Sequence, residues 1–212
     1  PISLSQPAFV PPWAGTPQGP LVVPGEYNAE LNLVDNGALK LQGTGQKFMV
    51  KAVHERPDED YATYQAFTRQ TMELMRQLGV LNSQLGEAGN KLRYIKEAIA
   101  QSPALEPELF KTHRALKDEL AALREALYGH PIRSANDEAN RPSIASKVWV
   151  VSYGHWGTTQ LPTATQRQAI TQASEELANF ATGAQVFDTK MADFEKALEA
   201  AGAPYTPGRK LK

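Results

Sequence analysis

The sequence predicts an α+β protein, in which a small antiparallel β-meander, part of a β-sandwich, precedes a long antiparallel three-helix bundle with an interrupted middle helix. Two observations carry this prediction. Short-period alternation of apolar and polar residues is confined to the region before Pro57, and apolar residues spaced by three and four dominate after it. The prediction therefore divides the chain into residues 1–56, a Pro-rich lead-in with three strands, and residues 57–212, a helical bundle with a C-terminal tail. A four-helix bundle is the alternative arrangement.

The strands follow an extended lead-in, because the prolines of the first twenty residues lack amide donors and fix φ. Apolar residues then alternate with polar ones from Tyr27 to Leu33, as in a half-buried strand. The turn residues Asp35-Asn36-Gly37 lead into a return strand at residues 38–42. Gly43-Thr44-Gly45 is expected to turn the chain again into residues 47–53. The resulting meander has an apolar face that only the helices or another sheet can cover.

The first helix is predicted from Asp58 to about residue 101, because apolar residues recur there at an alternating spacing of three and four. This seam has one polar exception, Thr71, and otherwise consists of Tyr64, Phe67, Leu74, Leu78, Leu81, Leu85, Ala88, Leu92, Ile95 and Ile99. Three glycines, Gly79, Gly86 and Gly89, leave the seam in phase, and we interpret them as points of close helix packing.

Three further segments complete the helical prediction. The second helix begins near Pro107 and ends before Gly129, and a polar loop over residues 130–141 follows it. Residues 144–153 could form a helix or a strand, because Lys147-Val148-Trp149-Val150-Val151 is rich in β-branched residues and local propensity favours a strand, but their context favours a short helix that ends at Gly154. The last long helix starts at a capping box of Thr163 and Gln166 and runs for about 38 residues to a glycine C-cap at Gly202.

Composition excludes several classes of function. The chain has 212 residues, no cysteine, 22 lysines and arginines and 23 acidic residues. Disulfides, thiolate metal sites and a catalytic thiol are therefore excluded. The near-zero net charge argues against a nucleic-acid partner, and no apolar run approaches the roughly 20 residues of a membrane span.

No group of residues has the spacing of a catalytic, cofactor or metal site. The four histidines, His54, His113, His130 and His155, form no spaced motif, and no Gly-x-Ser-x-Gly elbow occurs. The basic residues Lys91, Arg93 and Lys96 are diluted by neighbouring glutamates, and we interpret them as a solvated helix face. We therefore predict no catalytic residue, no cofactor and no metal.

The candidates for a ligand or interface site are aromatic residues near turns. Tyr153, His155 and Trp156 lie in a segment of aromatic and small residues, Ser152 to Thr159, directly before the last helix. Trp13 lies among prolines in the lead-in. A corner in which Trp156 plugs the bundle is the favoured interpretation, and a ligand-binding loop is the alternative.

Taken together, the ordered motifs resemble a known family. The segment Gly19-Pro20-Leu21-Val22-Val23-Pro24-Gly25-Glu26-Tyr27, the strands, the long helix, Gly157-Thr158-Thr159 and the closing Ala200-Ala201-Gly202-Ala203-Pro204-Tyr205-Thr206-Pro207-Gly208-Arg209 carry the likeness. They resemble the C-terminal region of exported bacterial sortilin-like, BNR or Asp-box glycosyl-hydrolase-type proteins, in which a β-propeller precedes a β-sandwich and an antiparallel helical region. No Ser-x-Asp-x-Gly-x-x-Trp Asp box and no blade repeat is present, so no catalytic residue can be carried over.

The resemblance implies an exported protein, in the periplasm, at the cell surface or outside the cell. It also implies that Pro1 is an internal or processed position and that the strands complete a sandwich begun elsewhere. We therefore predict a non-catalytic structural and interaction module that docks to, or scaffolds, a propeller or a larger extracellular assembly. Its partner would be the propeller, a sandwich-completing chain or another copy. An accessory domain that binds carbohydrate or another small ligand is the alternative, and a loop that completes a propeller's hydrolase cleft is a third hypothesis.

Overall fold

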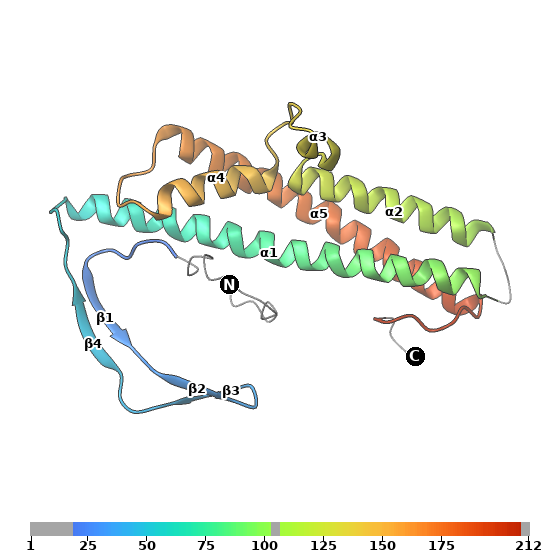
Figure 1. Cartoon of the computed structure of the whole chain (residues 1–212), viewed down its shortest axis with the longest axis horizontal. Coiled ribbons are helices and arrows are strands. Elements are labelled where there is room, and N and C mark those ends of the chain that lie inside the picture. Colours follow the sequence, from blue (N-terminus) through green and yellow to red (C-terminus); the bar gives the residue numbers. More distant parts are fainter. Residues whose placement is uncertain (1–18, 103–106, 209–212) are drawn as a thin grey trace. The chain divides into compact units, whose positions relative to one another are not determined.

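The computed structural model describes residues 19–102 and 107–208 and shows a mixed α and β protein (Figure 1). Four short strands come first and five helices follow. Trp13 lies outside the described residues.

The described residues form two compact units. The strand unit contains residues 19–70 and 153–162, and the helical unit contains residues 71–152 and 163–208. Two helices pass covalently from one unit into the other. The predicted division at Pro57, where the strands give way to the first helix, stays a prediction about domains.

The strands are paired as two small antiparallel sheets of two strands each. β1 (Gly25–Ala29) pairs with β4 (Gln46–Val50), and β2 (Asn32–Asp35) pairs with β3 (Ala38–Leu41). Figure 1 shows the two pairs following one another along a bent ribbon. At the end of the ribbon, Asn36 and Gly37 both have positive φ, 49° and 80°, as a two-residue type I′ hairpin turn requires.

The predicted three-stranded meander is wrong, because the Gly43-Thr44-Gly45 segment bends the chain without reversing it. Gln42 donates its backbone N–H to the carbonyl of Leu31 at 2.7 Å, which keeps the returning chain beside the outgoing one. Gly43 absorbs the distortion with a φ of 79°. β4 therefore continues past β3 and pairs with β1, and the outgoing strand is interrupted at Glu30 and Leu31.

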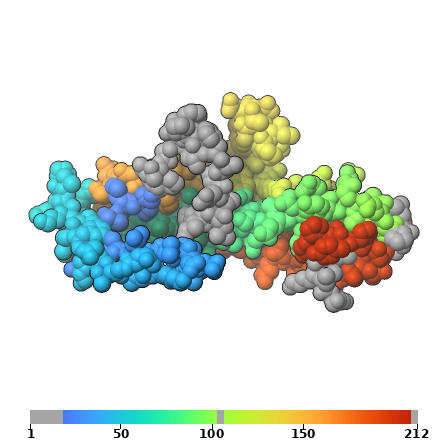
Figure 2. All heavy atoms as spheres, turned by 60° about the horizontal axis from the view of Figure 1, so that its bottom comes forward, coloured from blue at the N-terminus to red at the C-terminus, as the bar shows by residue number. Residues whose placement is uncertain are grey.

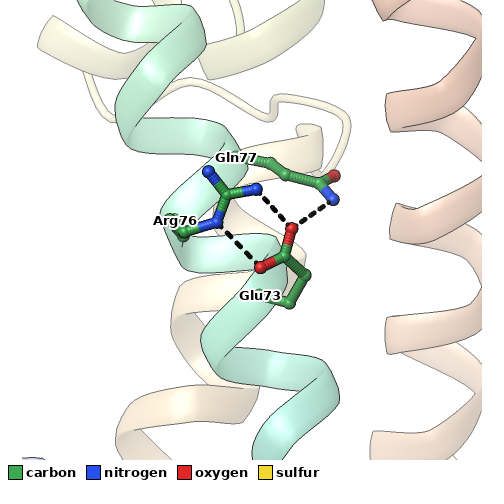
Figure 3. A network of polar contacts seen from close by, with 3 residues as sticks. All are labelled: Glu73, Arg76 and Gln77. Atoms are coloured by element: carbon green, nitrogen blue, oxygen red, sulfur yellow. Dashed lines mark hydrogen bonds and ion pairs between the residues drawn. The ribbon is translucent and has the colours of Figure 1, made fainter.

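α1 (Asp58–Ala100) has the predicted bounds and the predicted buried seam. Among the eleven seam residues only Leu81 is half-buried, and the others are buried. On the exposed side, Arg76 donates from Nε and Nη2 to the two carboxylate oxygens of Glu73 at 2.8 and 2.6 Å, and Gln77 donates to the same carboxylate at 2.9 Å (Figure 3). These bonds, with those from Arg76 the larger cause, lower the pKa of Glu73 to about 2.

Three helices lie between α1 and the last long helix in the described sequence order. α2 (Pro107–Tyr128) buries Leu109, Leu116, Leu120 and Leu127, as its predicted stripe requires. The loop predicted at residues 130–141 contains a short helix, α3 (Pro131–Ala135), which His130 caps by accepting the backbone N–H of Arg133 at Nδ1. α4 (Ile144–Trp156) is helical, as context favours, but it continues past Gly154 for two residues.

α5 (Ala164–Ala200) begins at the predicted capping box. The Thr163 hydroxyl accepts the N–H of Gln166 at 3.2 Å, and the Gln166 side chain accepts the N–H of Thr163 at 2.9 Å. Its seam is buried from Ile170 to Leu198, with Ala184 half-buried. Gly202 has a φ of 68°, as expected of a glycine that terminates a helix.

Contacts within the helical unit define the relative directions of its three long segments. Arg124 and His113 of α2 contact the carbonyls of Leu85 and Leu92 of α1, so that α2 runs antiparallel to α1. Lys190 of α5 bonds to Glu119 of α2. Lys91 of α1 pairs with Glu195 of α5 at 3.0 Å. Ser102, which follows α1, donates its hydroxyl to the carbonyl of Ala201, which follows α5, so that α1 and α5 run parallel.

The interpretation of the three glycines of α1 is wrong for two of them. A Cβ atom added at Gly79 or Gly86 would meet no atom within 4 Å, so neither residue is a point of close packing. Gly89 alone is crowded, with the guanidinium of Arg124 at 2.5 Å from such an atom. Across the described parts of the chain, no helix is long and apolar enough to cross a membrane.

Candidate interaction surface

The β-ribbon formed by β1 to β4 is an exposed feature of the strand unit. None of the residues in its four strands is buried. Atoms of this part of the chain, in blue, are visible at the surface in Figure 2. A two-stranded ribbon is marginally stable in water by itself, because each strand leaves one edge unpaired and neither face is covered. The ribbon therefore has the composition and geometry of a surface that another element covers.

One face of the β1–β4 pair is aromatic. Tyr27 lies directly opposite Phe48, and the two rings stack with their centroids 5.9 Å apart. Gly25 opposite Val50 continues this face. The other face carries Glu26 and Lys47, which form an ion pair of 2.8 Å. The predicted alternation is thus confirmed in this pair of strands.

The β2–β3 pair has its own apolar face. Val34 lies directly opposite Leu39, and 66% and 73% of their respective surfaces are exposed. Leu41, opposite Asn32, extends this face toward the bend. The opposite face contains an ion pair between Lys40 and Asp35. Exposed ion pairs add little stability, but they mark the face that can remain in water.

A cavity of about 330 Å³ lies at the base of the ribbon, within the strand unit. Residues 21–24, 50–54, Arg56, Tyr61, Tyr64 and Thr159 line it. Tyr64 donates its hydroxyl to the carbonyl of Leu21 at 3.2 Å, and Leu21 donates its N–H to the carbonyl of Trp156 at 3.2 Å. These bonds fix the chain that enters β1 against the start of α1 and the end of α4.

His155 is a core residue at this base. Its ring stacks on Tyr64 and meets Phe67 edge-on, with both centroid distances 4.9 Å, and only 1% of the residue is exposed. Neither ring nitrogen has a hydrogen-bond partner of good geometry. Burial lowers the pKa of His155, and the backbone of Gln160 opposes only part of this shift. The imidazole is therefore neutral at neutral pH.

The other two predicted site residues of this segment lie in different environments. Tyr153 is 77% exposed, whereas Trp156 is half-buried. Both belong to the last turn of α4, so the aromatic segment predicted as a turn is helical through Trp156. Trp13, the fourth predicted site residue, is not among the described residues.

Val34 and Leu39 are the residues of this surface that sequence reasoning missed. The alternation from Tyr27 to Leu33 assigns Leu33, and not Val34, to the apolar face. The Asn36-Gly37 turn contained the necessary signal, because a two-residue hairpin loop fixes Asp35 opposite Ala38 and hence Val34 opposite Leu39.

The chemical groups that this surface exposes are backbone groups and apolar side chains. Among residues 19–102 and 107–208, no three histidine or acidic side chains come together in a way that could hold a metal ion. The ribbon offers unpaired backbone groups along its edges and apolar side chains on its faces. No family model, curated protein or solved structure matched the chain, so the resemblance to exported propeller proteins stays a prediction.

Proposed function

We propose that the chain is a non-catalytic interaction module whose β-ribbon is completed by strands from another part of a larger assembly. The observation that carries this proposal is the pair Val34 and Leu39, two directly opposed aliphatic side chains exposed on a ribbon of only two strands. Burying a Val or Leu side chain contributes about 1.5–3 kcal/mol. A covering sheet would therefore gain stability from this face and would pair with a free strand edge.

The proposed occupant is a β-sheet, because the ribbon offers the two components that a sandwich uses. Its free edges provide backbone donors and acceptors in register for another strand. Its apolar faces provide the inward-pointing side chains that pack against a second sheet about 10 Å away. The resemblance described above motivates the source of that sheet, an exported propeller protein of the sortilin-like or BNR type, and the same resemblance motivates export.

The helical unit serves this function as a rigid support. We propose that α1, α2 with α4, and α5 form an antiparallel three-helix bundle whose middle helix is interrupted at residues 129–143. The contact registers between α1, α2 and α5 support this arrangement. Long helices with buried seams hold their ends in fixed positions, which suits a scaffold.

Site-specific photo-crosslinking tests the proposed function. A photoreactive amino acid at Leu39 is compared with the same amino acid at Lys40, its exposed neighbour on the opposite face, in the natural producing cell. We expect a crosslink from position 39 to a peptide of a β-strand, identified by mass spectrometry, and at least tenfold less from position 40. Equal yields, or only solvent-quenched product at position 39, would contradict the proposal.

A second candidate function is supported by the cavity at the base of the ribbon. Tyr61 and Tyr64 give this cavity aromatic surface suited to a carbohydrate ring or another small ligand. Trp156, whose carbonyl holds Leu21, provides a fluorescent reporter nearby. Sugar-dependent quenching of tryptophan fluorescence that disappears in Tyr61→Ala would support this function, and no response across a glycan panel would remove it.

A further inference from the structure

A groove of about 780 Å³ lies between α1 and α2 in the helical unit. Its α1 wall includes Asn82, Gly86, Gly89, Arg93 and Lys96, which recur at helical spacing along one face. At 1.5 Å per residue, this wall is about 21 Å long. Three buried leucines, Leu85, Leu92 and Leu120, contribute apolar surface to it.

The groove is open because α1 lacks side chains where a wall would otherwise fill it. Gly86 has empty space where a Cβ would lie. Gly89 leaves the Leu85 carbonyl accessible, and Arg124 donates its Nη2 to this oxygen at 2.9 Å. A Cβ at position 89 would lie 2.5 Å from the same nitrogen, so the glycine is required for this position of Arg124.

The charges of the groove are strongly unequal. Four cations, Arg93, Lys96, Lys117 and Arg124, line it, and Glu125 is the one acidic side chain among the described lining residues. All four cations are exposed. The described contacts include no ion pair to any of these four cations. Arg93 lies over the ring of Tyr94, and Arg124 donates a hydrogen bond to a backbone carbonyl. The positive charge of the groove is therefore available to an anionic partner.

We propose that this groove binds an extended acidic peptide segment of a partner protein. The arrangement of apolar and basic residues in the groove argues for this occupant. An apolar floor between two basic walls is complementary to a strand-like segment that alternates apolar and acidic residues. A length of about 21 Å accommodates roughly six extended residues. Diffuse attraction of a polyanion would require the charges but not the open apolar floor. This surface lies in the helical unit and is independent of the ribbon.

The binding test uses the whole chain and a fluorescein-labelled eight-residue peptide of alternating glutamate and leucine. Fluorescence anisotropy should show saturable binding that weakens at least tenfold between 50 and 500 mM salt, as expected for charge pairing. Peptides of alternating lysine and leucine, or glutamate and serine, should bind at least tenfold more weakly. Equal binding of the glutamate-serine peptide would reduce the site to diffuse electrostatics and overturn the proposal.

Charge reversal locates the site. Lys96→Glu and Lys117→Glu should each weaken binding of the glutamate-leucine peptide by about three- to tenfold. Arg114→Glu is the matched control, since Arg114 is exposed on the same helix as Lys117 and does not line the groove. An equal loss in Arg114→Glu would contradict a site in the groove.

Filling the groove separates binding from folding. Gly86→Leu should place a side chain in empty space, improve helix propensity and abolish peptide binding without lowering the melting temperature. Gly79→Leu makes the same change in α1, at a glycine that also has empty space but does not line the groove. It should leave binding unchanged. Retained binding in Gly86→Leu would overturn the proposal, whatever the outcome of the crosslinking from the ribbon.

Discussion

Val34 lies directly opposite Leu39 across the β2–β3 hairpin, and both side chains are exposed. If this face is covered in the assembly, a charge placed on it should prevent assembly without affecting the fold of the chain. We expect the double variant Val34→Lys and Leu39→Glu, whose new charges are of opposite sign across the strand pair, to have a free energy of unfolding within about 0.5 kcal/mol of that of the unmodified chain, because exposed substitutions have small effects. The mass of the native particle, measured by light scattering, should fall to that of the chain without its partner.

The matched control for that variant is Leu33→Glu, which introduces a charge of opposite sign to its cross-strand neighbour. Leu33 belongs to the same strand and lies opposite Lys40 on the other face. It should preserve the particle. A particle lost in both variants would contradict a one-sided interface.

Burial of His155 predicts a pH-dependent stability. Its pKa is lowered in the folded chain, so the unfolded chain binds the proton first as pH falls below about 6.5. Stability associated with this residue should therefore be complete above that pH and decrease as pH falls toward the lowered folded pKa. The melting temperature of His155→Phe should fall less between pH 7.5 and 5.0 than that of the unmodified chain. An equal fall of the melting temperature in His155→Phe and in the unmodified chain would contradict this assignment.

The capping box of α5 predicts a measurable local contribution. Thr163→Ala removes the acceptor of the Gln166 N–H and should lower the free energy of unfolding by about 1 kcal/mol. Thr165→Ala changes an exposed threonine in the first turn of the same helix and should have little effect or slightly stabilise the chain. Urea unfolding of both variants provides the comparison, and equal midpoints would show that the cap contributes nothing.

Phe187 tests the packing of the α5 seam. It is 1% exposed and is the largest side chain among the fully buried residues. Phe187→Ala should lower the free energy of unfolding by about 3–5 kcal/mol because it leaves a cavity. Val186→Ala, at the exposed neighbouring position, should change it by less than about 0.5 kcal/mol. Comparable losses in the two variants would contradict the assigned seam.

The hydrogen bonds between Arg76 and Glu73 predict a lowered pKa for the Glu73 carboxyl. An NMR titration of the Glu73 carboxyl should give a pKa of about 2, and Arg76→Gln should raise it toward the ordinary value. Gln77→Ala should raise it less, because Arg76 is the larger cause. Since the folded pKa is lowered, any stabilisation from this pair is present at neutral pH and is lost as pH falls toward 2. A Glu73 pKa that stayed at about 2 in Arg76→Gln would contradict the geometry in Figure 3.

The long helices could be predicted from sequence because their determinants are local. The seam of α1, the Pro107 start of α2 and the capping box at Thr163 each act within a few residues of the chain. The strand topology could not be predicted in the same way. Whether Gly43 reverses the chain or only bends it depends on which strand β4 pairs with, and that pairing is non-local.

The candidate sites show the same division. α4 continues past Gly154, although glycine costs up to about 1 kcal/mol in a helix, and this extension carries His155 to its buried position between two aromatic rings. In the sequence, glutamates lie close to the basic residues of α1. The other two cations of the groove, Lys117 and Arg124, lie on α2. A sequence displays one helix at a time, whereas a groove is formed by two.

Hydrogen exchange of the ribbon amides tests the interaction module most directly. The outward-facing amides of β2 and β4 should exchange rapidly in the isolated chain, because each strand has one partner. In the native particle, the same amides on the newly paired edge should exchange at least 100-fold more slowly, while amides of the α5 seam remain protected in both samples. Equal exchange rates of the ribbon amides in the isolated chain and in the native particle would contradict the account.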